Sequence, residues 1–206
     1  MAEHYFSESP ASDTRVREIE VTLAGTPRQL LTAGGVFSPE HLDRGTEVLL
    51  RSIADHAALT APGALLDLGC GWGPIALSAA LTSPDREVWA VDVNERAREL
   101  TTRNAERLAL RNVRVAAPAE VPETLRFATI LSNPPIRIGK LALHELLHSW
   151  LPRLSPGGTA LLVVAKHLGA DSLQRWIASE FAELQVTRIA RDKGFHVIEA
   201  VRATEA

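Results

Sequence analysis

The sequence predicts a doubly wound, Rossmann-like α/β fold, in which a mainly parallel sheet carries helices on both faces. From residue 64 onward, short apolar runs alternate with amphipathic segments of helical length, which is the pattern of repeated βαβ units. The last two expected strands are separated only by residues 190–194. This is too short for the crossover that parallel neighbours need, so the final strand should run antiparallel to the others.

The first elements are expected to precede the sheet as an N-terminal extension over residues 1–33. Residues 16–23 alternate apolar and polar side chains, and residues 28–33 follow a Gly25-Thr26-Pro27 segment, which predicts a β-hairpin. A helix is then expected from about Pro39 to Ala58, with Ser38 as its N-cap.

The remaining elements form the core of one domain that spans residues 1–206, with the catalytic core at 34–202. Strands are expected at 64–68, 87–92, 113–116, 128–132, 158–165, 183–190 and 195–202. Helices are expected at 73–82, 95–110, 140–151 and 170–181.

Composition restricts the class of protein. The 206 residues carry a formal net charge of −3, which argues against a protein that coats nucleic acid through its overall field. The single cysteine, Cys70, excludes an internal disulfide framework and is typical of a reducing compartment. We find no secretory signal and no apolar run of membrane-spanning length, so we expect a cytoplasmic protein with no membrane partner.

A glycine-rich turn follows the first strand of the core. The segment from Asp67 reads Asp-Leu-Gly-Cys-Gly-Trp-Gly and runs directly into a helix. Glycines allow a ligand to approach bare backbone, and a helix N-terminus offers free N–H groups. Asp92 ends the next strand, where a carboxylate can accept hydrogen bonds from both hydroxyls of a ribose. Together these features predict an adenosine-containing cofactor.

The fourth core strand ends in Asn133-Pro134-Pro135-Ile136. The two prolines fix the backbone, and the Asn side-chain oxygen and a Pro carbonyl become clustered acceptors. An exocyclic amine needs two such acceptors, because its lone pair is delocalised into the ring until the nitrogen becomes tetrahedral. The motif therefore predicts chemistry at an amino group.

These motifs resemble those of the class I S-adenosylmethionine-dependent methyltransferases that modify amino groups through an N-P-P sequence. Within that class, three further segments are similar to the small methyltransferase-domain family, which includes 16S and 23S ribosomal RNA guanine-N2 methyltransferases. The segments are Gly34-Gly35-Val36-Phe37-Ser38, Leu42-Asp43-Arg44-Gly45-Thr46 and Lys193-Gly194-Phe195-His196-Val197.

The resemblance implies a seven-stranded sheet of order 3-2-1-4-5-7-6 and S-adenosylmethionine as cofactor. Asp67 would orient the cofactor's amino group and Asp92 would bind its ribose, while Trp72 is either a contact or buried under the loop. The full set of residues expected to line the cofactor site is Phe37, Asp67, Gly69, Cys70, Gly71, Trp72, Gly73, Asp92, Val93 and Glu120. Relatives place an acidic residue after the third strand, and here either Glu120 or backbone groups would take its place.

For the substrate, the resemblance implies guanine N2 of ribosomal RNA or of the small ribosomal subunit. Asn133 and Pro134 would accept from the target amine, Pro135 and Ile136 would complete the motif, and Arg137 and Lys140 would meet RNA phosphates. Three alternatives stay open: methylation of a protein glutamine or a nucleic-acid adenine, a cofactor-binding scaffold without turnover, and a zinc peptidase. The sequence does not fix the oligomeric state.

The peptidase alternative rests on His144-Glu145-Leu146-Leu147-His148, a formal H-E-x-x-H motif. On a helix this spacing places two imidazoles on one face as zinc ligands. No third ligand stands at a suitable spacing, and Pro152 follows soon after. We therefore expect no metal and interpret the two histidines as surface or groove residues.

Overall fold

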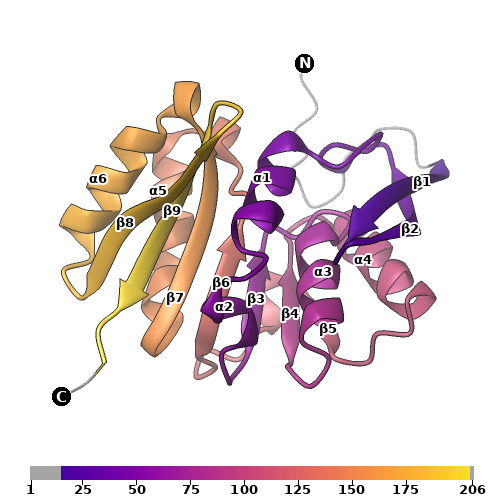
Figure 1. Ribbon diagram of the computed structural model, residues 1–206, viewed down its shortest axis with the longest axis horizontal. Coiled ribbons are helices and arrows are strands. Elements are labelled where there is room, and N and C mark those ends of the chain that lie inside the picture. The colour runs from indigo at the N-terminus through magenta and orange to yellow at the C-terminus, as the bar shows by residue number, and fades with distance from the viewer. Residues whose placement is uncertain (1–14, 205–206) are drawn as a thin grey trace.

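The protein contains a seven-stranded sheet with helices on both faces and a separate two-stranded hairpin (Figure 1). The computed structural model describes residues 15–204, apart from the side chain of Arg137. The hairpin strands are β1 (Val16–Leu23) and β2 (Thr26–Ala33). The sheet strands are β3 (Leu65–Leu68), β4 (Val88–Val91), β5 (Val113–Ala116), β6 (Phe127–Ser132), β7 (Leu154–Ala165), β8 (Leu184–Asp192) and β9 (Phe195–Arg202). The α-helices are α1 (Arg44–Ser52), α2 (Ala57–Thr60), α3 (Pro74–Thr82), α4 (Glu95–Arg107), α5 (Lys140–Trp150) and α6 (Ala170–Glu180).

The sheet order is β5-β4-β3-β6-β7-β9-β8. Counted from β3, this is the predicted order 3-2-1-4-5-7-6. Strand β9 pairs antiparallel with both β7 and β8, whereas β3 to β7 pair in parallel. The predicted fold class and the antiparallel last strand are therefore confirmed.

Two apolar layers hold the helices to the sheet. On one face, α5 and α6 bury Leu147 and Ile177 against β3, β6 and β7. On the other face, α1 and α3 bury Leu49 and Ala76 against the same strands, beside α2. Burial of both faces explains why the central strands are continuous apolar runs rather than alternating ones.

The hairpin packs against the domain but turns one step earlier than expected. Ala24 and Gly25 both have positive φ and connect Leu23 directly to Thr26, as in a two-residue type I′ loop. The expected turn at Gly25-Thr26-Pro27 is thus wrong, since Thr26 and Pro27 belong to β2. The Asn104 amide of α4 binds both the N–H and the carbonyl of Leu31, which fixes the hairpin to the core.

The expected helix from Pro39 to Ala58 is also wrong at its start and in its middle. Ser38 has a positive φ, and its hydroxyl donates to the His41 carbonyl, so it cannot act as an N-cap. The true cap is Asp43, whose carboxylate accepts from the Thr46 N–H at 3.1 Å. The segment then splits into α1 and α2, because the His56 side chain caps a second helix.

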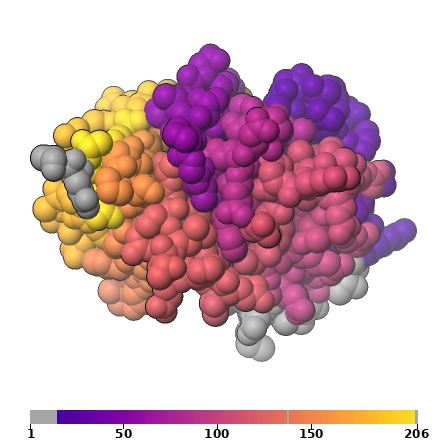
Figure 2. All heavy atoms as spheres, turned by 90° about the horizontal axis from the view of Figure 1, so that it is seen from below, coloured from indigo at the N-terminus to yellow at the C-terminus, as the bar shows by residue number. Residues whose placement is uncertain are grey.

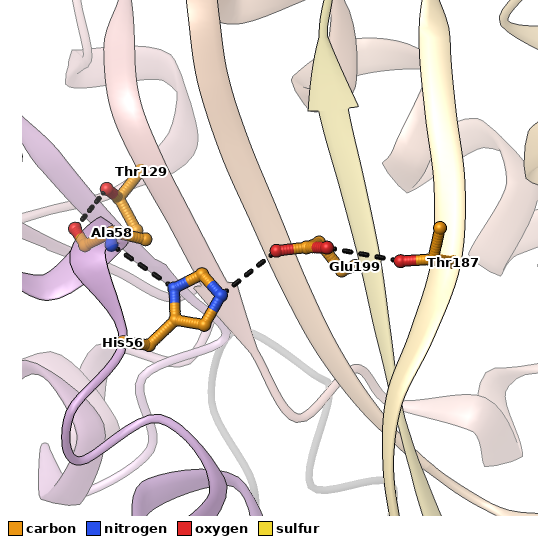
Figure 3. Close-up of polar contacts among 5 residues, drawn as sticks. All are labelled: His56, Ala58, Thr129, Thr187 and Glu199. Atoms are coloured by element: carbon orange, nitrogen blue, oxygen red, sulfur yellow. Dashed lines mark hydrogen bonds and ion pairs between the residues drawn. The ribbon is translucent and has the colours of Figure 1, made fainter.

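A polar network, which we call the α2 network, ties α2 to the sheet (Figure 3). His56 Nδ1 accepts from the Ala58 N–H, and its Nε2 contacts Glu199 Oε1 at 3.0 Å. Thr187 donates to the other oxygen of Glu199 at 3.1 Å. Because Nδ1 is an acceptor, Nε2 carries the N–H that donates a hydrogen bond to Glu199. The network therefore joins α2 to β8 and β9.

Arg86 completes the α2 network at the end of the sheet where the parallel strands begin. Its guanidinium donates to four carbonyls and to the Thr129 hydroxyl. Figure 2 looks onto this end and shows the purple segment around α2 between the yellow and orange C-terminal strands and the magenta residues after β3.

None of the helices within residues 15–204 has the length and apolarity that crossing a membrane requires.

Candidate active site

The predicted site residues meet at the opposite edge of the sheet, where β3, β4 and β6 end. These strands are adjacent and parallel, with Asp67 aligned to Ala90 on one side and to Leu131 on the other. The loops that follow them therefore emerge side by side. One carries the glycine turn, the next Asp92, and the third Asn133.

The glycine turn is an open platform. A Cβ atom at Gly69 or Gly71 would meet no other atom within 4 Å, and both residues have positive φ. The loop's own N–H groups are largely used, because Gly69 and Cys70 donate to Val91, and Gly73 donates to Cys70. The loop therefore offers space and close backbone approach rather than a set of free donors, contrary to expectation.

Asp92 shapes that platform from the end of β4. Its Oδ2 accepts from the Gly71 N–H at 2.9 Å, and its Oδ1 accepts from the Asn94 N–H at 2.9 Å. Burial raises the pKa of the Asp92 carboxyl, although these backbone hydrogen bonds oppose the shift. The Val93 N–H is a third backbone donor to this carboxylate. A carboxylate offers about four lone-pair sites, so acceptor capacity remains for a ribose hydroxyl.

Asp67 lies beneath the turn with one oxygen unpaired. The side chain is fully buried, its Oδ2 accepts from the Ala76 N–H at 2.9 Å, and its Oδ1 has no partner within the described part of the chain. Burial, with a smaller contribution from the charge of Asp92, raises the pKa of Asp67 to about 8. A buried acceptor without a partner indicates a place for a donor that comes from a ligand.

The other residues expected around the cofactor fall into three groups. Phe37 and Val93 expose 44% and 45% of their surface at this edge, which leaves apolar area open to a ligand. Trp72 is buried among hairpin and α4 residues, with its indole N–H on the Ser38 carbonyl, and Cys70 is buried too. Glu120 turns back to accept from the Ala117 N–H at 2.6 Å.

The side chains of Trp72 and Cys70 therefore point into the core, and only their backbone remains for the expected cofactor role. Since Trp72 closes the contact between hairpin and glycine turn, its burial is explained by packing. The interpretation of Trp72 as a buried support of the loop fits the structure.

The Asn-Pro-Pro segment forms a tight turn directly after β6. Pro135, with φ −74° and ψ 74°, occupies the centre of an inverse γ-turn in which the Ile136 N–H donates to the Pro134 carbonyl at 2.8 Å. That carbonyl retains one lone pair for a second donor. Ile136 packs partly against the apolar layer of α5 and α6.

The Asn133 side chain is oriented by α1. Its Nδ2 donates to Asp43 Oδ2 at 2.8 Å and to Thr46 Oγ1 at 3.1 Å. Both N–H bonds of the amide are thereby used, and Oδ1 is left as an acceptor. The role of Asp43 escaped the sequence analysis, although the motif from Leu42 to Thr46 contained both partners.

The expected substrate cations lie beyond this turn. Lys140 begins α5 and is exposed. Arg137 belongs to a single 3-10 turn, Ile136–Ile138, and its side chain lies outside what the structure describes. The sequence order thus places both residues next to the Asn-Pro-Pro turn.

The H-E-x-x-H segment lies on α5, and its histidines have other partners. The His144 ring stacks on Trp176 with centroids 3.5 Å apart, and His148 pairs with Glu180 at 3.3 Å. Within the described residues, no three His, Cys, Asp or Glu side chains gather in a way that could hold a metal ion. The absence of a metal stays a prediction.

A groove of about 1080 Å³ lies elsewhere, between β1, α1 and α3, where it is lined by Val21, Leu50, Ile75 and Ser78 among others. None of the residues expected to bind cofactor or substrate lines this groove. The candidate site is therefore defined by the converging polar groups at the strand ends rather than by this groove.

Comparison with known proteins finds an uncharacterised relative and relatives that are named as enzymes. The chain is 34% identical over 203 residues to the uncharacterised protein YbxB of Bacillus subtilis, covering 97% of this chain and 98% of that protein. It is 28% identical over 203 residues to ribosomal RNA small subunit methyltransferase C of Stutzerimonas stutzeri, covering 94% of this chain and 57% of the relative. The chain thus spans little more than half of that enzyme.

Among solved structures, the T. thermophilus 16S rRNA N2 methyltransferase RsmC, in complex with AdoMet and guanosine, superimposes with a TM-score of 0.75. The two chains are 22% identical, and the match covers 91% of this chain and 50% of that one. At this identity, the likeness shows a shared fold.

The family model described as the Methyltransferase small domain matches residues 27–199. This range contains the glycine turn, Asp92 and the Asn-Pro-Pro turn, and it agrees with the family that the sequence motifs predicted. Because the match covers well over half of the chain, this protein belongs to the Methyltransferase small domain family.

Proposed function

We propose that this protein transfers a methyl group from S-adenosylmethionine to an exocyclic amine of ribosomal RNA, with guanine N2 as the target. The observation that carries the proposal is the Asn133 amide, whose nitrogen is fully engaged by Asp43 and Thr46 so that its oxygen is free to accept. The family match and the ribosomal RNA methyltransferases among the relatives support the reaction class and the substrate.

The residues at the strand ends fit S-adenosylmethionine. The open backbone at Gly69 and Gly71 leaves room for a ligand, and Asp92 retains acceptor capacity for its ribose hydroxyls. The unpaired Oδ1 of Asp67 would receive a hydrogen bond from its ammonium group, whose positive charge would favour the ionised carboxylate over the protonated form that burial alone favours. Exposed Val93 and Phe37 offer apolar surface for the flatter parts of the ligand.

Asn133 and Pro134 would hold the target amine. The two N–H bonds of the amine would point at Asn133 Oδ1 and the Pro134 carbonyl, which stabilises a tetrahedral nitrogen and frees its lone pair. When bound, S-adenosylmethionine supplies an electrophilic methyl: the nitrogen forms the new N–C bond, the S–C bond breaks with its electrons to sulfur, and the methylated amine loses one proton to water. Orientation by these two acceptors is the main contribution of the chain.

RNA binding is proposed to be local. Lys140 is exposed next to the Asn-Pro-Pro turn, and Arg137 precedes it in the chain, so both could neutralise phosphates that flank an unpaired guanine. The reaction would take place in the cytoplasm, where ribosomal particles are assembled.

A second candidate is methylation of a protein glutamine. Release factor glutamine methyltransferase of Vibrio cholerae is 42% identical to this chain, though over only 93 residues, or 44% of the chain. The amide nitrogen of a glutamine would need the same two acceptors. The two candidates differ in the size and charge of the substrate, so one assay can separate them.

The test compares small ribosomal subunits and release factor as methyl acceptors. Subunits are purified from a strain that lacks this gene, and methyl transfer from labelled S-adenosylmethionine is followed by mass spectrometry of the RNA nucleosides. We expect N2-methylguanosine in the RNA and no label in the release factor. Label in the glutamine of the release factor alone would support the second candidate and rule out the first. Label in neither substrate would contradict the proposal.

A further inference from the structure

The first turn of α1 and the Asn-Pro-Pro turn are joined through one carboxylate. Asp43 Oδ2 accepts from the backbone N–H of Thr46 at 3.1 Å and from Asn133 Nδ2 at 2.8 Å. The Thr46 hydroxyl, on a buried residue, accepts from the same amide nitrogen at 3.1 Å. A helix cap therefore also holds a side chain that lies 90 residues further along the chain.

This arrangement allows only one orientation of the Asn133 amide. Asp43 Oδ2 accepts from the Thr46 N–H, so this acceptor faces the NH₂ end of the amide and not its oxygen. A rotated amide would place its oxygen against the Asp43 carboxylate and lose that hydrogen bond, whereas the Thr46 hydroxyl could donate to the rotated oxygen. The Asn133 oxygen must therefore face away from α1.

The space around this contact is tight. A Cβ atom at Gly45 would lie 2.9 Å from Asp43 Oδ2, 3.0 Å from Phe195 Cε1 and 3.3 Å from Asn133 Nδ2. Any side chain at Gly45 would thus press on both members of the hydrogen bond. The bare backbone at Gly45 allows the helix turn to approach Asn133 closely enough for Asp43 and Thr46 to reach it.

We propose that Asp43 and Thr46 are positioning residues for methyl transfer, which fix the Asn133 amide so that its oxygen faces the target amine. This inference rests on the function proposed above and assigns a role to the helix cap that packing alone does not require. A carboxylate that accepts from an amide also polarises it, which makes the amide oxygen a stronger acceptor. No bond of the transfer forms to Asp43 or Thr46.

Three substitutions separate positioning from helix capping. Asp43→Ser keeps an N-cap but is too short to reach Asn133, whereas Asp43→Asn keeps both a cap and an acceptor. Ser and Asn cap helices about equally well, so a difference between these two variants does not reflect loss of the cap. Thr46→Val removes only the hydroxyl, and Asp55→Ser, an exposed site just beyond α1, is the matched control.

The kinetic readout is methyl transfer to subunits from the deletion strain. By analogy with other residues that orient a reacting group through a hydrogen bond, Asp43→Ser should lower kcat about 10- to 100-fold. Asp43→Asn should keep kcat close to that of wild type. Thr46→Val should also lower kcat, but its fold-loss should be several times smaller than that of Asp43→Ser. The KM for subunits and the Kd for S-adenosylmethionine should stay near wild type. In an Asn133→Ala background, Asp43→Ser should cause no further loss, because the group it orients is absent.

A second readout needs no substrate. The NH₂ protons of Asn133, assigned in NMR spectra by their disappearance in Asn133→Ala, should exchange slowly with water in wild type and in Asp43→Asn, but fast in Asp43→Ser. Equal exchange in all three proteins, or an Asp43→Ser turnover within twofold of wild type, would overturn the inference. If wild type methylates no subunit, the proposed function fails, and the exchange rates alone decide whether Asp43 positions the amide.

Discussion

Around α2, polar groups are hydrogen-bonded to one another, whereas at the ends of β3, β4 and β6 they remain open. Arg86 uses its whole guanidinium on four carbonyls and one hydroxyl, and His56 joins Glu199 to a backbone N–H. At the other edge, Asp67 Oδ1 is buried without a partner, and the oxygen of Asn133 is left over once its nitrogen is bound.

The difference separates stability from function within one sheet. A buried polar group without a partner costs about 1–3 kcal/mol, so open acceptors in a core are a disadvantage to folding. They are expected where a ligand completes them. Removing a group of the α2 network should therefore lower stability. At the ends of β3, β4 and β6, which we call the open edge, removing an acceptor should change binding or turnover and can even raise stability.

The largest expected effect concerns Asp67 and pH. Burial raises its pKa to about 8, so the folded protein binds this proton more tightly than the unfolded chain does. Between pH 5 and pH 8 the unfolded chain is ionised at this group and the folded protein is not, so unfolding releases the proton and stability falls as pH rises. The slope is about 1.4 kcal/mol per pH unit, or about 4 kcal/mol over the window.

Asp67→Asn removes that group from the titration. The difference in unfolding free energy between wild type and Asp67→Asn, measured by urea denaturation without cofactor, should therefore change steadily from pH 5 to pH 8 in favour of the variant. A difference that is independent of pH would show that Asp67 is ionised in the folded protein. Using the difference cancels the contributions of other titrating groups.

Arg86→Ala should produce the largest loss at the α2 network. It removes five hydrogen bonds and leaves the carbonyls of Ala58, Leu59 and Gly63 without this donor, for which we expect about 3 kcal/mol in unfolding free energy. Arg103→Ala, whose exposed side chain pairs with Glu99 within one helix, is the matched control, with an expected change within about 0.5 kcal/mol. Equal effects of the two variants would show that the α2 network contributes no more to stability than an exposed ion pair does.

Asn133→Ala tests the open edge. Loss of one preorganised acceptor should lower turnover by about 10²–10³, with little change in the Kd for S-adenosylmethionine. Asn112→Ala makes the same chemical change at a closed position, where the amide donates to the carbonyls of Ala80, Ser83 and Arg86. That variant should lose stability and keep its turnover per folded molecule. If both variants lost turnover to the same extent, the division of the sheet into two regions would be wrong.

The sequence predicted the residues at the ends of β3, β4 and β6 better than it predicted the α2 network. The bounds of most strands and helices agree within a few residues, because period and apolar length are local properties. The glycine turn and the Asn-Pro-Pro turn are also local, and their placement follows from parallel strand ends. The partners of Arg86 and Asn133 lie up to 43 and 90 residues away, and such contacts have no local signature.

The segment before α1 shows the same limit. Ser38-Pro39-Glu40 has the composition of a helix start, but Ser38 adopts a positive φ after the Gly34-Gly35 turn, and its hydroxyl binds the His41 carbonyl. Asp43 is the better cap because its oxygen serves Thr46 and Asn133 together. Tertiary context therefore decides where α1 begins, and the sequence pattern alone could not choose between the two caps.

The smallest of the expected effects concerns the cofactor contact at Asp92. Asp92→Ala removes two charge-assisted acceptors for the ribose, which should weaken S-adenosylmethionine binding by about 1.5–3 kcal/mol in calorimetry. The same change deletes the hydrogen bonds to Gly71 and Asn94, so part of the loss could come from a relaxed glycine turn. Asp92→Asn keeps one oxygen for a backbone N–H and should fall between wild type and Asp92→Ala, whereas the exposed Asp85→Ala on the α3–β4 loop should bind as wild type does. Affinity that is unchanged in Asp92→Ala would remove Asp92 from the cofactor site and leave its carboxylate as a structural support of the turn, like the closed groups around α2.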